Sequence, residues 1–77
     1  MQVTVYSKPN CPVCEKVIEH CKKDTGIDLE IKSADKLNNG NEFNPEALKF
    51  LAKQNFRTPL VFVDGKWCER PLDFFKL

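Results

Sequence analysis

Two cysteines separated by two residues carry the clearest chemistry in this chain. Cys11-Pro12-Val13-Cys14 follows a run of strand-type residues and opens a run with helical periodicity. Two thiols at this spacing can close a reversible disulfide, so the pair predicts thiol-disulfide exchange. The same spacing also occurs in zinc sites, and the spacing alone does not separate the two chemistries.

The position of Cys11 favours its ionised form. Pro12 suits the first position of a helix, because its ring fixes φ and the N–H that it lacks would be unpaired there, so Cys11 falls at or near the N-cap. The unpaired N–H groups and the helix dipole stabilise negative charge there, and Lys8 adds a positive charge. Thiols in such sites have pKa values of roughly 3.5 to 7.5 instead of about 8.5, so Cys11 is the expected nucleophile. Cys14, one turn further along, is predicted to be less exposed and to resolve the mixed disulfide.

Alternating strand and helix patterns position this pair. Residues 2–6 have β-branched and aromatic strand character, and residues 12 to about 24 place apolar side chains at helical spacing. Gly26 suits a left-handed position just past the end of that helix. Residues 27–31 alternate apolar and charged side chains, which predicts an edge strand with one face covered.

A second helix is predicted after a polar stretch. Residues 33–44 are polar and rich in asparagine, which predicts a surface loop. Asn44 and Pro45 supply an N-cap and a first-turn proline for a helix that runs to about residue 55. The inner stripe predicted for this helix is Ala47, Leu48, Leu51 and Ala52.

The last part of the chain predicts a hairpin and a short helix. Residues 60–63 form a continuous apolar run, and Asp64-Gly65 is a strong two-residue turn signal before residues 66–68 return antiparallel. Residues 71–77 predict a short amphipathic helix, so the expected order is βαβαββα, with the first two strands parallel and joined by a right-handed crossover. The side chains of this final helix available for packing are Leu72, Phe75 and Phe74.

Composition bounds the function classes. The 77 residues, 42% of them hydrophobic, predict a single domain over residues 1–77 with a modest core. The 12 basic and 11 acidic residues leave a net charge of +1 without a run of like charge, which argues against a nucleic-acid partner. Met1 is followed at once by a strand pattern, and no run approaches about 18 apolar residues, so we expect no membrane association. A monomer in the reducing cytoplasm is the expectation for such a chain.

Two segments give the chain a family resemblance. The run from Tyr6 to Cys14, and Thr58-Pro59 leading into the apolar strand 60–63, resemble the small glutaredoxins and glutaredoxin-like proteins of the thioredoxin fold. The resemblance spans nearly the whole chain. It implies an α/β fold with a four-stranded mixed sheet flanked by three helices, and catalysis by the two cysteines. It also implies that the Thr58-Pro59 bond is cis and lies beside the active disulfide. X-Pro bonds adopt the cis form at modest cost, and a proline in a sheet belongs at the entry of a strand.

The resemblance implies binding residues as well. The Thr58 backbone beside Pro59 is expected to bind a peptide or glutathione by strand-like hydrogen bonds. Lys8 matches the family residue that meets a glutathione carboxylate, and Arg57 is a candidate for a similar part.

The segment from Cys68 to Asp73 departs from the family. Glutaredoxins carry a glycine pair there, which helps to receive the γ-glutamyl end of glutathione, and this chain has none. Glu69 would repel the glutathione carboxylate, whereas Arg70 would attract it. Together with Trp67, this segment weakly resembles the C-terminal signature of glutaredoxin-like proteins that take electrons from thioredoxin reductase.

The predicted function is that of a dithiol oxidoreductase that reduces protein disulfides or glutathione mixed disulfides. Glutathione is the expected co-substrate, and no bound cofactor or metal is expected. One alternative is an electron donor that is reduced by thioredoxin reductase and serves ribonucleotide reductase. A non-enzymatic alternative is an iron-sulfur or metal-binding protein that uses the same two cysteines. A module that only keeps the fold is disfavoured by the intact cysteine pair.

Three other residues receive structural interpretations. Cys21 lies on the same helix face as Cys14 and is expected to be a small core residue. His20 points away from that stripe and is expected to be exposed to solvent. Cys68 is expected to be a thiol without a catalytic role.

Overall fold

A computed structural model describes residues 1–34 and 44–77. Its elements in chain order are β1 (Gln2–Ser7), α1 (Pro12–Lys23), β2 (Asp28–Ser33), α2 (Pro45–Lys53), β3 (Leu60–Val63), β4 (Lys66–Cys68) and α3 (Pro71–Phe74). The order βαβαββα is the one that the sequence predicts. Most of the predicted surface loop, residues 35–43, lies outside the described residues.

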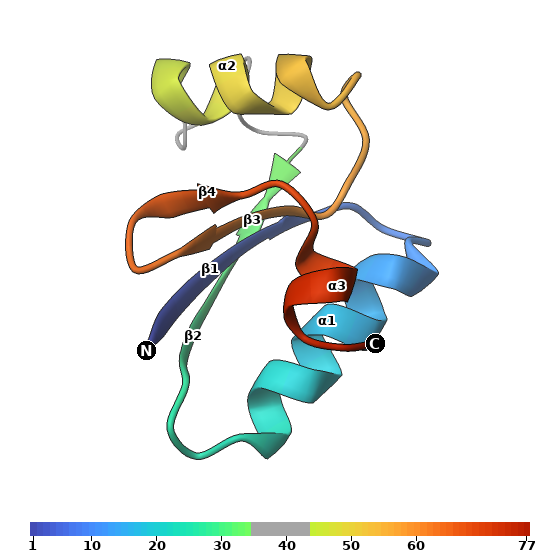
Figure 1. Ribbon diagram of the computed structural model, residues 1–77. Coiled ribbons are helices and arrows are strands. Elements are labelled where there is room, and N and C mark those ends of the chain that lie inside the picture. Colours follow the sequence, from blue (N-terminus) through green and yellow to red (C-terminus); the bar gives the residue numbers. More distant parts are fainter. Residues whose placement is uncertain (35–43) are drawn as a thin grey trace.

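The strands form a mixed sheet in the order β2-β1-β3-β4. β1 and β2 are parallel, β3 is antiparallel to β1, and β4 is antiparallel to β3. β2 therefore lies at an edge, as predicted. Figure 1 shows α1 and α3 on one side of the sheet and α2 on the other, so the helices cover both faces.

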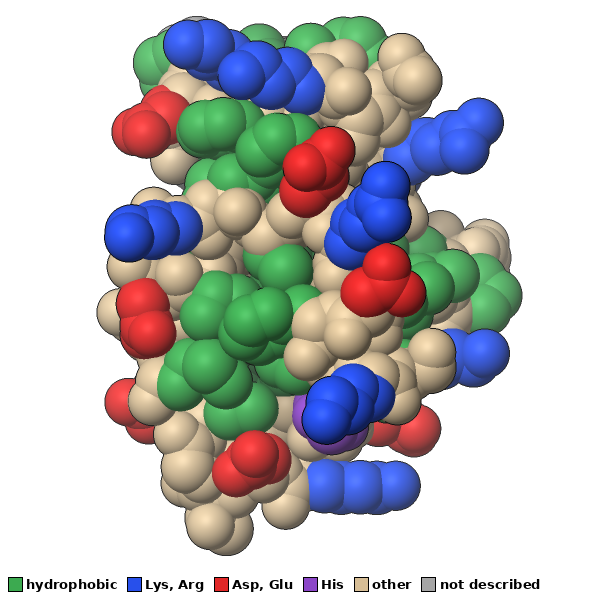
Figure 2. All heavy atoms as spheres, viewed as in Figure 1, with side chains coloured by type: hydrophobic (Ala, Val, Ile, Leu, Met, Phe, Trp, Pro, Cys, Tyr) green, Lys and Arg blue, Asp and Glu red, His purple; other side chains and the backbone are tan. Residues whose placement is uncertain are grey.

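The alternation of side chains along the strands builds two apolar layers. Toward α1 and α3, Val3 and Val5 pack with Val17 of α1 and with Phe75, which follows α3. Toward α2, the core consists of Tyr6, Ala34, Ala47, Leu51 and Leu60. Lys, Arg, Asp and Glu side chains are interspersed over the face drawn in Figure 2, in keeping with the nearly balanced charge of the chain. Within residues 1–34 and 44–77, no helix is long and apolar enough to cross a membrane.

α1 begins as the sequence predicts but ends differently. Pro12 is its first residue and Cys11 is its N-cap. At the other end, Asp24 has extended backbone angles, and its carboxylate accepts the N–H of Gly26 at 2.9 Å. Gly26 is not among the residues with positive φ, so the left-handed cap predicted for it is wrong. The aspartate side chain makes the turn instead, by an Asx-type hydrogen bond.

α2 is capped as predicted, but its buried face is shifted. The Asn44 side chain accepts the N–H groups of Glu46 and Ala47 at 3.1 and 3.2 Å. Ala52, predicted on the inner stripe, is exposed, whereas Phe50 is partly buried. The ring of Phe50 reaches the Trp67 ring, with 5.1 Å between centroids, and this contact turns the 47-50-51 face toward the sheet.

The hairpin forms as predicted, and two apolar side chains are more exposed than predicted. Asp64 and Gly65 of this hairpin have φ values of 51° and 82°, the positive angles that a type I′ turn requires. Phe74, which the sequence offers for packing, is 51% exposed, because α3 is one turn long and the core receives Leu72 of α3 and Phe75 just after it. Ile31 is 48% exposed, so the covered face of β2 ends before it.

His20 is also placed differently from its prediction. Its side chain is partly buried, and its ring centroid lies 5.2 Å from that of Phe75. The segment after α3 turns back over α1 and covers this position.

Candidate active site

Cys11 and Cys14 form a disulfide at the first turn of α1, with their Cα atoms 5.2 Å apart. The backbone of Cys11 is extended, as an N-cap requires, and its Sγ accepts the N–H of Cys14 at 3.2 Å. Cys11 is partly exposed, whereas Cys14 is 1% exposed. The predicted difference in exposure is therefore confirmed, and an incoming group reaches Cys11 first.

A second segment, which contains the cis peptide bond between Thr58 and Pro59, lies against this sulfur. The Thr58 hydroxyl donates to Cys11 Sγ at 3.4 Å, and the Thr58 carbonyl oxygen lies 3.9 Å from the same sulfur. Pro59 directly precedes β3, where its missing N–H removes no hydrogen bond from within the strand. The cis bond and its place beside the disulfide are as predicted.

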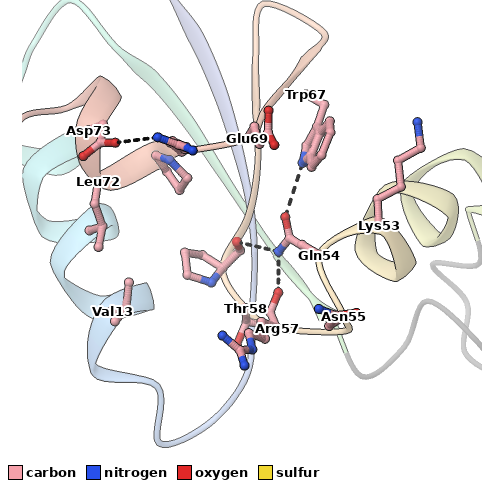
Figure 3. Close-up of a pocket in the computed structure, with 13 residues that line it drawn as sticks. Val13, Lys53, Gln54, Asn55, Arg57, Thr58, Trp67, Glu69, Leu72 and Asp73 are labelled. Carbon is pink, nitrogen blue, oxygen red and sulfur yellow. Dashed lines mark hydrogen bonds and ion pairs between the residues drawn. The ribbon is translucent and has the colours of Figure 1, made fainter.

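A groove of about 490 Å³ opens beside the disulfide (Figure 3). Its walls come from the first turn of α1, the segment between α2 and β3, β4 and α3. The predicted binding residues in its lining are Arg57, Thr58, Pro59 and Arg70. Four positions chosen from the sequence as binding residues thus lie along one surface.

Lys8, the remaining predicted binding residue, lies elsewhere. It lines a separate cleft of about 370 Å³, together with Asn10, Cys14 and Ile31. The structure therefore does not bring Lys8 into the groove that holds Arg57 and Arg70. The two hollows flank the disulfide, because one is lined by Val13 and the other by Cys14.

Charges of both signs line the larger groove. Lys53 and Arg57 lie near its α2 end, and Glu69 lies beside Arg70 at the α3 end. Arg70 also faces Asp73, with 4.0 Å between guanidinium nitrogen and carboxylate oxygen, and both side chains are largely exposed. An exposed pair of this length contributes little stability, so Arg70 can turn toward another anion at small cost.

Two residues connect the walls of the groove: Gln54, which sequence reasoning missed, and Trp67, which it noted only as part of the C-terminal signature. The Gln54 amide nitrogen donates to the carbonyl oxygen of Arg57, and also to that of Pro59 at 3.0 Å. The Trp67 indole N–H donates to the Gln54 amide oxygen at 3.3 Å, and these bonds are the dashed lines around Gln54 in Figure 3. A signal was present in the sequence, because Gln54 is a polar residue seven positions after Ala47, at a position that continues the buried face of α2.

The other two cysteines lie on the α1 side of the sheet, where both pack into the apolar core. Burial raises the pKa of the Cys21 thiol, and the nearby Asp24 charge raises it further. Burial also raises the pKa of Cys68, against a smaller lowering effect of a hydrogen bond with the Arg70 backbone. Among the described residues, no group of three or more histidine, cysteine or acidic side chains lies close enough to hold a metal ion.

Comparisons with known proteins agree with this geometry. A family model described as a glutaredoxin-like domain (DUF836) matches residues 2–77. Among solved structures, the chain is similar to NrdH-redoxin from Escherichia coli, described as a glutaredoxin-like protein with a thioredoxin-like activity profile. The two share 26% sequence identity with a TM-score of 0.64, over 99% of this chain and 92% of the other. No curated protein matches the chain significantly.

Proposed function

The chain belongs to the family of glutaredoxin-like domains, and from that premise we propose that it is a dithiol thiol-disulfide oxidoreductase. Its substrates are disulfide-containing proteins and mixed disulfides. One observation carries this proposal. The Cys11–Cys14 disulfide lies at the N-terminus of α1, with Thr58 and the cis Pro59 against the exposed sulfur.

The reaction is two successive exchanges. The Cys11 thiolate attacks one sulfur of the substrate disulfide, the substrate S–S bond breaks, and the first product thiolate leaves and takes a proton. Cys14 then loses its proton and attacks Cys11 Sγ in the mixed disulfide, which releases the second product thiolate. The dithiol gives up two electrons, the substrate disulfide gains them, and the Cys11–Cys14 disulfide is the oxidised product.

Local contacts support the assignment of Cys11 as the attacking sulfur. The N–H of Cys14 and the hydroxyl of Thr58 both point at Cys11 Sγ, and both would donate to a thiolate there. The dipole of α1 favours negative charge at the same point. Cys14 is 1% exposed, whereas Cys11 is partly exposed.

The proposal also concerns the reductant that restores the dithiol. Glutathione is the first candidate, with Arg57 and Arg70 as carboxylate partners along the groove. Thioredoxin reductase is the second, and two observations favour it. The α3 end of the groove carries Glu69 in place of the glycines of glutaredoxins. NrdH-redoxin, similar over nearly the whole chain, is described by a thioredoxin-like activity profile. Under that route, ribonucleotide reductase is a candidate electron acceptor, and the cytoplasm is the expected compartment.

A recycling assay tests the proposal. Oxidised protein is supplied with NADPH and either glutathione with its reductase or thioredoxin reductase alone, and NADPH consumption is followed with insulin as the disulfide substrate. We expect one route to sustain turnover in the wild type. Failure of both routes would contradict the proposal. Metal analysis and a visible spectrum of anaerobically purified protein test the metal-binding alternative in parallel.

A further inference from the structure

We propose that Gln54 is a positioning residue that turns Thr58 toward the substrate, an inference that rests on the function proposed above. Gln54 lies just past the end of α2 and bonds three other groups through one side-chain amide. Two of these groups are backbone carbonyls on either side of Thr58. The third is the indole of Trp67.

The two carbonyls determine which side of the segment faces the disulfide. The carbonyls of Arg57 and Pro59 both accept from the Gln54 amide nitrogen, so both face α2. The carbonyl oxygen of Thr58 lies 3.9 Å from Cys11 Sγ, and its hydroxyl donates to the same sulfur. Gln54 thus bonds the two carbonyls that flank Thr58, while Thr58 itself contacts the disulfide.

Trp67 determines which way round the amide lies. An indole N–H is a donor only, so the atom that faces it must be the amide oxygen of Gln54. The two hydrogens on the amide nitrogen then face the two carbonyls, and the reversed amide would oppose oxygen to oxygen and hydrogen to hydrogen. Trp67 is itself held by stacking on Phe50 of α2, with ring planes 29° apart.

This arrangement has a consequence for substrate selection. Gln54 engages the carbonyls of Arg57 and Pro59. The Thr58 backbone is therefore the part of this segment that faces the reacting sulfur. A substrate with a peptide backbone next to its disulfide can align on that edge as an added strand. A small disulfide without a backbone cannot. Gln54 should therefore matter for peptide disulfides and not for small ones.

Two substitutions separate the parts of this inference. Gln54→Met keeps the length of the side chain and removes all three bonds. Gln54→Glu keeps an acceptor for Trp67 but opposes a carboxylate to the two carbonyls. Lys49→Met, on the exposed side of α2, is the matched control. For each variant we measure kcat and KM with a disulfide-linked peptide, the reduction of hydroxyethyl disulfide, the alkylation rate of Cys11 by iodoacetamide, and the thermal midpoint.

The inference predicts a split between substrates. In Gln54→Met, KM for the peptide disulfide should rise about tenfold, because the alignment of roughly one strand-like hydrogen bond is lost, and in Gln54→Glu it should rise further. Peptide kcat, hydroxyethyl disulfide reduction and Cys11 alkylation should stay within about twofold of the wild type. Lys49→Met should match the wild type throughout.

Other outcomes overturn it in distinguishable ways. An unchanged KM for the peptide, or an equal loss on the peptide and the small disulfide, would refute the role of Gln54 while leaving the oxidoreductase assignment intact. A wild type that reduces neither disulfide would refute the proposed function and this inference with it. If Gln54→Met does not fold, Trp67→Phe is tested instead. This substitution can keep the ring stack on Phe50 but removes the hydrogen bond from the indole to the Gln54 amide. Its peptide KM should rise about threefold, and an unchanged value would refute the inference.

Discussion

The four cysteines occupy two regions in which the same functional group has opposite surroundings. Cys11 and Cys14 lie at the first turn of α1, where the N–H of Cys14 and the Thr58 hydroxyl both donate to Cys11 Sγ. Cys21 lies two turns further along the same helix, among apolar side chains and near Asp24. Cys14 and Cys21 are equally buried, so burial alone does not distinguish them. The comparison teaches that contact with the exposed, capped end of the helix separates a reactive pair from inert core thiols.

The largest expected effect comes from removing the exposed sulfur. Cys11→Ser should lower the rate of disulfide reduction by about three orders of magnitude or more, because a hydroxyl is not ionised at neutral pH and cannot form the mixed disulfide. The measurement is insulin reduction with the route that recycles the wild type. Activity equal to that of the wild type would place the chemistry outside this pair.

Replacing Cys14, the buried member of the pair, should affect protein disulfides and glutathione mixed disulfides differently. Cys14→Ser leaves Cys11 at the helix N-terminus but removes the thiol that resolves the mixed disulfide. Reduction of protein disulfides should be lost, while removal of glutathione from a glutathionylated peptide should stay within about tenfold if glutathione resolves the intermediate. Trapping the mixed disulfide and detecting it by mass spectrometry checks the first part. A variant that still reduces insulin at the wild-type rate would show that Cys14 is not the resolving thiol.

In the core region, the same kind of substitution should change stability and not activity. Cys21→Ala removes a sulfur from a packed cluster and should lower the free energy of unfolding by about 1 kcal/mol, as measured by urea denaturation. Turnover by the folded variant should equal that of the wild type. A loss of turnover comparable to that of Cys11→Ser would remove the distinction between the two regions.

A smaller effect is expected from pH. The pKa of Cys21 is raised above the ordinary value of a thiol in the folded state, so the folded protein holds that proton at pH values where the unfolded chain loses it. Stability from this group is therefore complete below about pH 8.5 and falls as the pH rises toward the folded-state pKa. Urea denaturation of the wild type and Cys21→Ala from pH 7 upward measures the difference. If the difference in unfolding free energy between the wild type and Cys21→Ala grows as the pH rises, the expected sign is wrong.

Much of the fold could be predicted because its signals are local. Asn44, Pro45 and the Asp64-Gly65 turn act within a few residues of themselves, and each forms as the sequence predicts. The errors concern choices that distant contacts make. Ala52 and Phe50 are both compatible with a helix face, and the rings of Phe62 and Trp67, on other elements, select Phe50.

The candidate site divides in the same way. The place of Cys11 at the helix start follows from Pro12, and the Thr58-Pro59 bond follows from the motif before β3. The family resemblance implies that these two segments lie together, but the bond from the Thr58 hydroxyl to Cys11 Sγ, across 47 residues, required the structure. The separation of Lys8 from the groove and the bonds of Gln54 also depend on how elements meet in space, which spacing along the chain does not encode.

The most direct test of the account is a titration of the Cys11 thiol. Reduced protein is alkylated with iodoacetamide across a range of pH, and modification of Cys11 is followed by mass spectrometry, with Cys21 in the same samples as the internal reference. The account predicts that the Cys11 rate has a midpoint below about pH 7.5, while Cys21 stays unreactive at neutral pH. A Cys11 midpoint at about 8.5 or above, as for a free thiol, would contradict it.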